Sequence, residues 1–330
     1  MGKVFRGGQR QAIELHNGLL ENGLSSYFVS LENGELNSKS FANKISCKYK
    51  NPINFSLTLK EIVENIKPDI VHFHEAKSLN GIYLLKKDIK TVETRRVLFP
   101  ISTFSIYSKY KICNVHVAVS ETVANYLKRY FKNVYIIESF LNTERLDKII
   151  EANPLKKIFQ INLLYVGALT KEKSVSDIIY ALKKTKYAEK IGLHIVGGGA
   201  ESENLKSLAD KLELSNVIFY GEKNNPQDFY RTCDIFINPS ISEGSSGVLK
   251  ESLYFDLPTV VRDIPTNRYF QKIFPEVRLF DNNSSKDLTK ELDSIIEGGL
   301  NRLDTSKKVK QLYSLENYVK NYLSLYEDIL

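Results

Sequence analysis

The sequence has few cysteines and no long hydrophobic run. Its three cysteines, Cys47, Cys113 and Cys233, are odd in number and widely separated, which argues against a disulfide framework and a zinc site. This cysteine usage fits a reducing cytoplasm. No run reaches the roughly eighteen apolar residues that a membrane-spanning helix needs, and no apolar segment of the signal-peptide type follows Met1. The composition therefore favours a cytoplasmic globular protein.

The positive charge of the chain is dispersed along the sequence. The 330 residues carry a formal net charge of +7, and the sequence pI is about 9.0. Such a charge attracts anionic partners, including nucleoside diphosphates, lipid phosphates and nucleic acids. There is no arginine-rich tail, which argues against a nucleic-acid partner. The length, about twice that of a typical domain, predicts two domains.

Short apolar segments alternate with amphipathic segments, as strands and helices do in α/β proteins. The first half contains candidate strands at residues 26–31, 69–74, 90–93, 115–120 and 133–138, and a candidate helix at 121–131. After a polar stretch around residues 151–154, candidate strands follow at 162–166, 192–196, 217–220, 235–238 and 259–261. Candidate helices lie at 174–184, 202–214, 285–297 and from 306 to the end. We predict two α/β domains with parallel sheets, over residues 1–152 and 153–330. The last helix could pack back on the first of these domains.

Ligands of parallel sheets bind beyond the carboxyl ends of the strands. Five segments lie at such ends: residues 7–8, 72–77, 167–173, 197–199 and 240–247. The three glycines at 197–199 are not followed by a glycine at the spacing of the dinucleotide fingerprint. A nicotinamide-dependent dehydrogenase is therefore disfavoured.

The most informative motif is the segment SEGSSGVLKE at residues 242–251. Glu243 and Glu251 flank a Gly/Ser turn, and a helix is expected to begin near Ser246. The free N–H groups at the start of that helix suit a phosphate. The Glu251 carboxylate could accept hydrogen bonds from vicinal hydroxyls such as those of a ribose, and Glu243 could meet a sugar. The plain alternative is a helix start with an acidic residue on its solvated face.

This segment resembles the Glu-x7-Glu motif of retaining glycosyltransferases of the GT-B fold, in particular glycosyltransferase family 4. Other segments resemble that family in the same order: 163–167 (LLYVG), 194–199 (HIVGGG), 216–221 (NVIFYG) and 229–235 (FYRTCDI). The resemblance is close over residues 160–265 and looser in the N-terminal half. It implies two Rossmann-like domains whose parallel sheets face each other across a cleft.

The resemblance also implies roles for residues of the second domain. Glu243 would contact the donor sugar and support the developing charge, and Glu251 would hold the donor ribose. Other donor-binding residues would be Gly198 and the run Gly244, Ser245, Ser246, Gly247 and Val248. Lys173 matches a lysine that clamps the diphosphate, whereas Ala168 stands where the family usually has an arginine.

In the N-terminal half, the resemblance makes Gly7 and Gly8 a glycine loop near the donor phosphates. His74 would face the transferred sugar as a catalytic residue, although a lone strand histidine is more often a core residue. Four arginines are candidates to bind an acceptor anion: Arg6, Arg10, Arg95 and Arg96. Lys171 or Arg6 could also replace the cation missing at Ala168.

The resemblance raises one question about the N-terminal sheet. Family members carry a complete strand before the glycine loop, and only residues 1–5 stand there in this sequence. A missing strand would remove a central strand from the first sheet.

The resemblance implies a retaining glycosyltransferase that moves a sugar from a nucleoside diphosphate sugar, with a UDP-sugar favoured, to a glycan or lipid-linked acceptor. Surface polysaccharide or lipopolysaccharide synthesis would be its context. Neither a cofactor nor a metal is expected. Basic and aromatic segments such as 104–111 would allow peripheral contact with an anionic membrane. The alternatives are a non-catalytic nucleotide-sugar-binding subunit and a nucleotide-sugar epimerase of similar fold.

Overall fold

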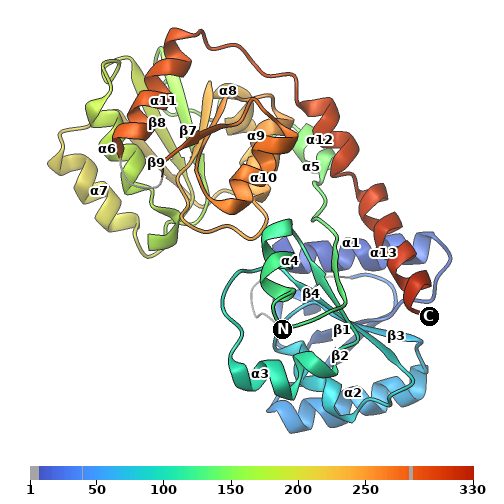
Figure 1. Ribbon diagram of the computed structural model, residues 1–330. Coiled ribbons are helices and arrows are strands. Elements are labelled where there is room, and N and C mark those ends of the chain that lie inside the picture. The colour runs from blue at the N-terminus through green and yellow to red at the C-terminus, as the bar shows by residue number, and fades with distance from the viewer. Residues whose placement is uncertain (1–6, 39, 282–284) are drawn as a thin grey trace. The chain divides into compact units, whose positions relative to one another are not determined.

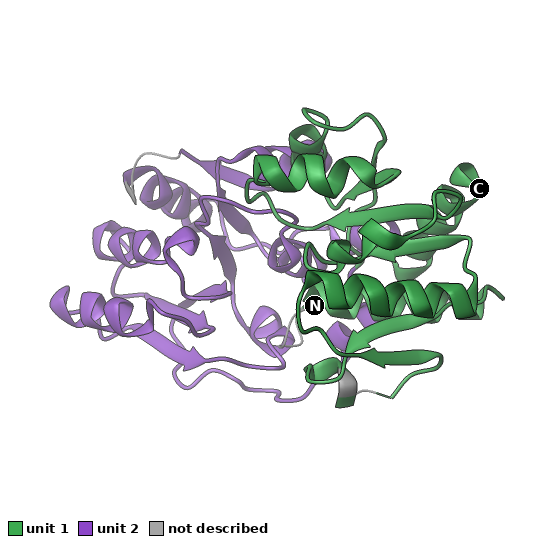
Figure 2. Cartoon of the chain, turned by 90° about the horizontal axis from the view of Figure 1, so that it is seen from below, with its two compact units in different colours: residues 1–140, 313–330 green, residues 141–312 purple. Residues whose placement is uncertain are grey.

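The computed structural model describes residues 7–38, 40–281 and 285–330. The chain folds as two compact units (Figure 2): unit 1 comprises Met1–Phe140 and Tyr313–Leu330, and unit 2 comprises Leu141–Leu312. Within the described residues, no helix has the length and apolar character that crossing a membrane requires.

Unit 1 contains two parallel sheets (Figure 1). Strands β1 (Phe28–Leu31) and β2 (Lys44–Cys47) form one, and β3 (Ile70–Phe73), β4 (Lys90–Arg95), β5 (Val115–Ala118) and β6 (Val134–Ile136) form the other in that order. The predicted strands of this half are all present, whereas β2 was not anticipated. β2 is short and only its last residue is buried, so its sequence carries little periodic signal.

The helices of unit 1 include α1 (Gly7–Glu21), α2 (Pro52–Ile66), α3 (Thr103–Ser108), α4 (Glu121–Leu127) and α13 (Leu315–Ile329), with 3-10 turns η1 (Glu35–Ser38), η2 (Ser78–Leu84) and η3 (Tyr110–Ile112). Local sequence signals explain where helix α2 begins and ends. The Asn51 side chain caps it by accepting from the Asn54 N–H at 2.8 Å, and Pro52 occupies the first turn. Lys67 ends it in the left-handed conformation, with φ of 53°.

Helix α13 packs along α1 and supplies tyrosines to the interior of unit 1. A Cβ at Gly18 of α1 would overlap the side chain of Val319, so this glycine permits the close approach of the two helices. The Tyr322 hydroxyl lies 2.9 Å from Thr94 Oγ1, and the Tyr326 hydroxyl lies 2.6 Å from His72 Nδ1. The last eighteen residues are therefore an integral part of the first unit.

The single helix expected from residue 306 onward is in fact two. Helix α12 (Ser306–Leu312) belongs to unit 2, and α13 starts anew after Ser314. The Ser314 hydroxyl accepts from the Asn317 N–H at 3.1 Å. A serine in this capping position favours a new helix start over continuation.

Unit 2 is built on one parallel sheet in the order β12-β11-β10-β7-β8-β9. Its strands are β7 (Ile161–Val166), β8 (Ile191–Val196), β9 (Val217–Gly221), β10 (Ile235–Asn238), β11 (Thr259–Arg262) and β12 (Arg278–Phe280). Alternate residues of β7 enter two different cores. Leu163 and Tyr165 pack in one core, and Leu164 and Val166 pack in the other, as expected of a strand covered on both faces.

Helices cover both faces of this sheet (Figure 1). They are α5 (Thr143–Asp147), α6 (Ser176–Lys184), α7 (Ser202–Lys211), α8 (Gln227–Thr232), α9 (Gly247–Tyr254), α10 (Pro265–Ile273), α11 (Ser285–Glu297) and α12, with the 3-10 turn η4 (Lys171–Lys173). Helices α6 and α11 contribute to the core that contains Leu163, and α8 contributes to the core that contains Leu164.

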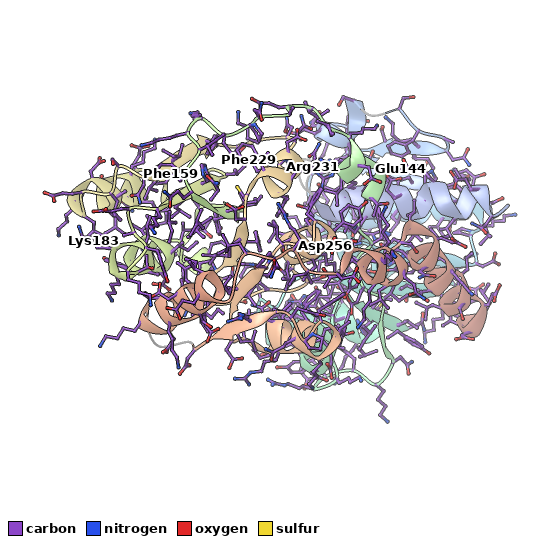
Figure 3. All side chains as sticks on the ribbon, turned by 90° about the horizontal axis from the view of Figure 1, so that it is seen from above. Glu144, Phe159, Lys183, Phe229, Arg231 and Asp256 are labelled. Carbon is purple, nitrogen blue, oxygen red and sulfur yellow. The ribbon has the colours of Figure 1, made fainter. Side chains whose placement is uncertain are left out.

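Unit 2 begins before the boundary expected after residue 152. Hydrogen bonds hold the polar stretch of residues 148–151 on α8, the helix that carries Phe229 and Arg231, which are labelled in Figure 3. The Asp228 carboxylate accepts from the N–H groups of Ile150 at 3.1 Å and Glu151 at 2.9 Å. Arg231 Nη1 donates to the carbonyl oxygen of Lys148 at 3.4 Å. A polar composition marked this stretch as a linker, but its partners place it in the second unit.

The contact between α13 and the second sheet of unit 1 yields a stability prediction. Tyr326→Phe removes the hydroxyl that bonds His72 and should cost about 1 kcal/mol of unfolding free energy. The expected result is a lower midpoint in thermal unfolding of the full chain. Tyr180→Phe is the matched control, because Tyr180 on α6 is 41% exposed. Equal midpoints for the two variants would contradict the assigned role.

Candidate active-site residues in the two units

The sheet of unit 2 has a switch point between β7 and β10. Strands β8 and β9 lie on one side of β7. The chain then crosses back, and β10, β11 and β12 lie on the other side of β7. In such sheets the crevice beyond the carboxyl ends of the two strands at the switch point binds ligands. The loop after β7 contains Lys173, and the loop after β10 contains Glu243.

These two side chains form an ion pair across the switch point. Lys173 Nζ lies 2.7 Å from Glu243 Oε1, and the two side chains are 27% and 10% exposed. The backbone also joins the loops, because the Ile241 N–H donates to the carbonyl oxygen of Glu172 at 2.9 Å. The structure thus brings together two residues that the sequence separates by seventy positions.

Asn238 and Thr266 hold the Glu243 loop in place. Asn238 Nδ2 donates to Glu243 Oε1 at 3.2 Å and to Ser246 Oγ at 3.3 Å. Thr266 Oγ1 donates to the carbonyl oxygen of Glu243 at 2.7 Å. Sequence reasoning missed both residues. The only available signal was the position of Asn238 as the last, polar residue of an apolar strand.

The turn Gly244–Ser245–Ser246 leads directly into α9, whose first residues are Gly247 and Val248. Ser246 is 1% exposed and precedes the helix. No side-chain hydrogen bond caps this helix start among the residues that the structure describes. The N–H groups of the first turn therefore remain suited to an anion.

Glu251 lies one turn into α9 and is paired with Arg145 of α5. Arg145 Nη2 donates to Glu251 Oε1, and Arg145 Nη1 lies 3.4 Å from Gln227 Oε1. The Glu251 and Arg145 side chains are 14% and 23% exposed. Sequence reasoning did not identify Arg145, because nothing in its local sequence marks it as part of a site. Both acidic residues of the motif therefore carry a cationic partner from a different segment.

Glycines bring the loops after β7 and β8 close together. Gly197 has φ of 150°, and a Cβ there would overlap the carbonyl oxygen of Gly167. Gly199 has φ of 153° and would clash with the backbone of Leu169 in the same way. A Cβ at Gly198 would lie 2.9 Å from Cγ of Glu222. These glycines are required for the close packing of the loops beside Lys173.

In unit 1, His74 and Arg96 lie together beside Gly8 at the start of α1. Arg96 Nη1 donates to the His74 carbonyl oxygen at 3.0 Å, and Arg96 Nη2 lies 3.2 Å from His74 Nδ1. Gly7 and Gly8 are the first residues of α1 and not a loop before it. A Cβ at Gly8 would lie 3.1 Å from Cδ of Arg96, so the absence of a side chain there lets the arginine reach His74.

The electrostatics of this cluster keep both histidines neutral. Burial, then the charges of His72 and Arg96, hold the pKa of His74 well below its ordinary value. Burial, then Arg96, lowers the pKa of His72 to about 3. Because a guanidinium can only donate, Arg96 assigns the acceptor role to His74 Nδ1. The neutral ring then carries its proton on Nε2, where it can donate.

The other predicted arginines lie in different surroundings. Arg95 belongs to β4, is 6% exposed and donates to the carbonyl oxygen of Phe99. Its guanidinium also lies over the Tyr126 ring. Arg95 is therefore an interior residue, whereas the sequence suggested it as a candidate to bind an acceptor anion. Arg10 is exposed on α1, and Arg6 lies outside the described residues.

Comparison with known proteins identifies the family of the chain. Residues 143–312 match the model of glycosyl transferases group 1, and residues 5–145 match the model of glycosyltransferase family 4. An uncharacterized glycosyltransferase of Haemophilus influenzae is 25% identical over 340 residues, which cover 96% of this chain and 95% of that protein. The O-antigen biosynthesis glycosyltransferase WclY of Escherichia coli is 29% identical over 163 residues, which cover 49% of this chain and 44% of that protein.

A solved structure shows the same fold. The Anabaena protein HepE, crystallised in complex with UDP, superposes with a TM-score of 0.84 at 12% identity, covering 99% of this chain and 100% of HepE. Its likeness confirms the α/β fold class and the two Rossmann-like halves predicted from the sequence. The chain belongs to the glycosyl transferases group 1 family, with a GT-B fold that resembles glycosyltransferase family 4.

Proposed function

We propose that the protein is a retaining glycosyltransferase that uses a nucleoside diphosphate sugar, with UDP as the favoured nucleotide. The observation that carries the proposal is the meeting of Lys173, Glu243 and the uncapped start of α9 at the switch point of unit 2. Cations and helix N-termini are the groups that bind a diphosphate. The UDP bound to HepE supports the choice of nucleotide.

The donor would be held at three places. The diphosphate would lie at the start of α9 with Lys173 beside it, and the ribose hydroxyls would donate to Glu251. Arg145 would act as a positioning residue, because its bond to one carboxylate oxygen of Glu251 orients that carboxylate. Glu243 would stand next to the sugar, oriented by Asn238 and Thr266.

Transfer would break the bond between the anomeric carbon and the phosphate oxygen. Positive charge would develop on the sugar ring, and negative charge would grow on the leaving diphosphate. Lys173 and the α9 N-terminus would stabilise the leaving group, and the Glu243 carboxylate would stabilise the ring. Neutral His74 would donate from Nε2 to a sugar hydroxyl. The acceptor hydroxyl would then attack on the same face and pass its proton to the leaving phosphate oxygen, which retains the anomeric configuration.

We further propose that the acceptor is a saccharide or lipid-linked saccharide of surface glycan synthesis, used on the cytoplasmic side of the membrane. The similarity to WclY supports the context. Around α3, four apolar side chains are 50–79% exposed: Phe99, Phe104, Tyr107 and Ile112. Lys111 Nζ lies 4.1 Å from the centre of the Tyr107 ring. Exposed aromatic side chains with lysines suit an anionic lipid surface.

The donor site is tested first by nucleotide binding. Thermal unfolding would be measured with UDP, GDP, ADP and CMP. A nucleotide at a hundred times its dissociation constant should stabilise the protein by about 2.7 kcal/mol. We expect UDP to act most strongly and Glu251→Ala to weaken its effect. Glu297→Ala is the control, because Glu297 is 51% exposed on α11. A chain that none of the four nucleotides stabilises would not be a transferase of this kind.

Catalysis is tested by turnover of UDP-sugars with lipid-linked acceptors. Glu243→Gln should lower kcat by roughly 100-fold or more, the usual effect of losing a group that stabilises the transition state. His74→Gln should keep more activity than His74→Ala, because a neutral amide can still donate. Glu203→Gln, 83% exposed on α7, is the control. Nuclear magnetic resonance would give the anomeric configuration of the product. An inverted product, or full rates in all variants, would overturn the mechanism.

Membrane contact is tested by sedimentation with vesicles of phosphatidylglycerol and phosphatidylcholine. The double variant Phe104→Ser and Tyr107→Ser should bind anionic vesicles at least roughly tenfold more weakly, because each buried aromatic side chain contributes about 1.5–3 kcal/mol. Ile158→Ser, at a 71% exposed position of unit 2, should bind as the unmodified chain does. Equal binding by both variants would exclude α3 as the membrane contact.

A further inference from the structure

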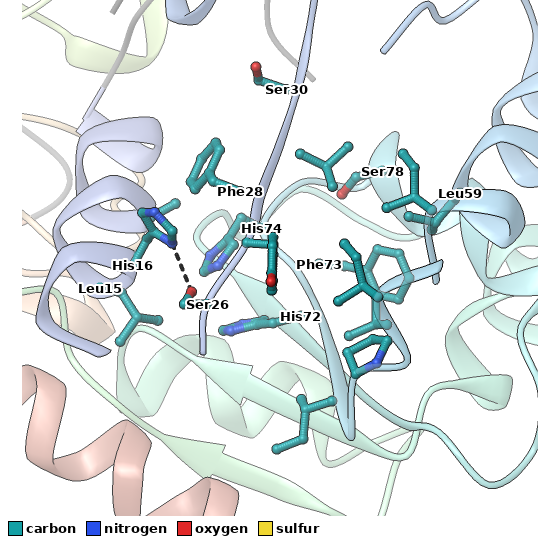
Figure 4. A pocket seen from close by; sticks show the side chains of 18 of the residues that line it. Leu15, His16, Ser26, Phe28, Ser30, Leu59, His72, Phe73, His74 and Ser78 are labelled. Atoms are coloured by element: carbon teal, nitrogen blue, oxygen red, sulfur yellow. Dashed lines mark hydrogen bonds between the residues drawn. The ribbon is translucent and has the colours of Figure 1, made fainter. Parts of the chain in front are cut away.

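The imidazole ring of His72 lies against that of His74, the residue to which the proposed function gives a catalytic role. The two residues flank Phe73, the last residue of β3, and alternate residues of an extended chain point to the same side. Their ring centroids are 3.9 Å apart, and the ring planes are tilted by 36°. Both residues line a cavity of unit 1 (Figure 4). The two rings are thus in direct contact at the candidate site.

A single hydrogen bond does not fix the orientation of the His74 ring. The torsion χ2, which turns a histidine ring, has broad energy wells. Arg96 Nη2 lies 3.2 Å from His74 Nδ1 and limits where that nitrogen can lie. The ring can still tilt about this bond, and the neighbouring ring of His72 blocks the tilt on one side. A fixed His72 therefore limits the direction in which His74 Nε2 points.

Hydrogen bonds at both ring nitrogens hold His72. Its Nδ1 lies 2.6 Å from the Tyr326 hydroxyl, and its Nε2 lies 2.7 Å from Thr94 Oγ1. A neutral imidazole has one donor and one acceptor nitrogen, and a hydroxyl can pair with either. Both nitrogens are therefore satisfied wherever the proton lies. Because one partner comes from α13 and the other from β4, two separate elements hold the ring.

Helix α13 presents a row of buried tyrosines to these histidines. Tyr318, Tyr322 and Tyr326 recur every four residues, a spacing that places them on one face of the helix. The Tyr322 hydroxyl lies 2.9 Å from Thr94 Oγ1, and the centroid of its ring lies 5.3 Å from that of His72. Burial raises the pKa of Tyr322 and of Tyr326 above the ordinary value. Their hydroxyls therefore keep their protons and stay neutral hydrogen-bonding groups.

We propose that Tyr326 and Thr94 are positioning residues for sugar transfer: they hold His72, and the ring of His72 keeps His74 in the orientation in which it donates. The inference rests on the proposed function, in which neutral His74 donates from Nε2 to a sugar hydroxyl. Rates depend steeply on the placement of a catalytic group. Helix α13 therefore contributes to the rate of transfer as well as to the stability of unit 1.

Turnover of full-chain variants tests the proposal, measured as UDP release from the UDP-sugar that the unmodified chain uses. Tyr326→Phe and Thr94→Val each remove one partner of His72 and nearly keep the shape of the side chain. We expect each to lower kcat by roughly tenfold, because misplacement of a catalytic group is costly. The KM for the UDP-sugar should change less than about twofold, since binding of the nucleotide is assigned to unit 2. Thr94→Ser keeps a hydroxyl and should recover most of kcat.

Tyr126→Phe is the matched control. The Tyr126 hydroxyl accepts from the Ile101 N–H at 2.6 Å, so this variant also removes a hydrogen-bonded tyrosine hydroxyl from unit 1. Tyr126 packs against the core that contains Val123, whereas Tyr326 belongs to a different core. When all variants are assayed well below their unfolding midpoints, Tyr126→Phe should turn over at the rate of the unmodified chain.

A double-mutant cycle separates positioning from a general loss of structure. In the His74→Ala background, Tyr326→Phe should lower kcat no further, because residues that act as a unit are not additive. A purely structural role would lower kcat by the same factor in both backgrounds, and that result would overturn the proposal. So would a full rate for Tyr326→Phe beside a slow His74→Ala, which leaves the proposed function intact. A full rate for His74→Ala would instead refute the role of His74 itself, and this inference with it.

Discussion

The candidate donor site depends on one constraint, the reversal of strand order between β7 and β10. Parallel strands present all their carboxyl ends at one edge, and the connections leave a switch point in opposite directions. The loops after β7 and β10 are therefore forced to approach each other. The Lys173–Glu243 pair and the bond from Ile241 to Glu172 follow from this approach. The loop after β8 joins them because glycines at 197 and 199 remove the atoms that would clash.

The same constraint organises unit 1. Its histidines and Arg96 cluster at the carboxyl ends of β3 and β4, as the parallel topology requires. Among the described residues, α1 packs on the β3–β6 sheet through side chains such as Leu15 and Leu19, which share a core with Val92. The tyrosines of α13 add hydrogen bonds to this packing through Thr94 and His72. A chain segment remote in sequence thus stabilises the residues that lie closest to the candidate chemistry.

Periodic patterns in the sequence predicted part of the fold, whereas the amphipathic helices α2 and α10 were not anticipated. The observed bounds of β10 and α11 are the predicted ones. A continuous apolar run marks the buried strand, and an amphipathic period of 3.6 residues marks the helix. β2 and the break between α12 and α13 escaped prediction, since both depend on a few local bonds. In the candidate site, Glu243, Glu251 and Lys173 stood in a motif. Arg145, Asn238 and Thr266 did not, and only the three-dimensional path of the chain brings them there.

The position of Arg145 bears on the substitution at Ala168. Under the proposed function, a diphosphate brings negative charge to a region where Lys173 and Arg145 are already paired with carboxylates. Both cations keep unused donors, however. An ammonium has three N–H groups and a guanidinium has five, and Arg145 Nε has no partner among the described residues. Each cation can therefore hold its carboxylate and still donate to an anion. An arginine from α5 can in this way supply charge that the loop after β7 does not carry at position 168.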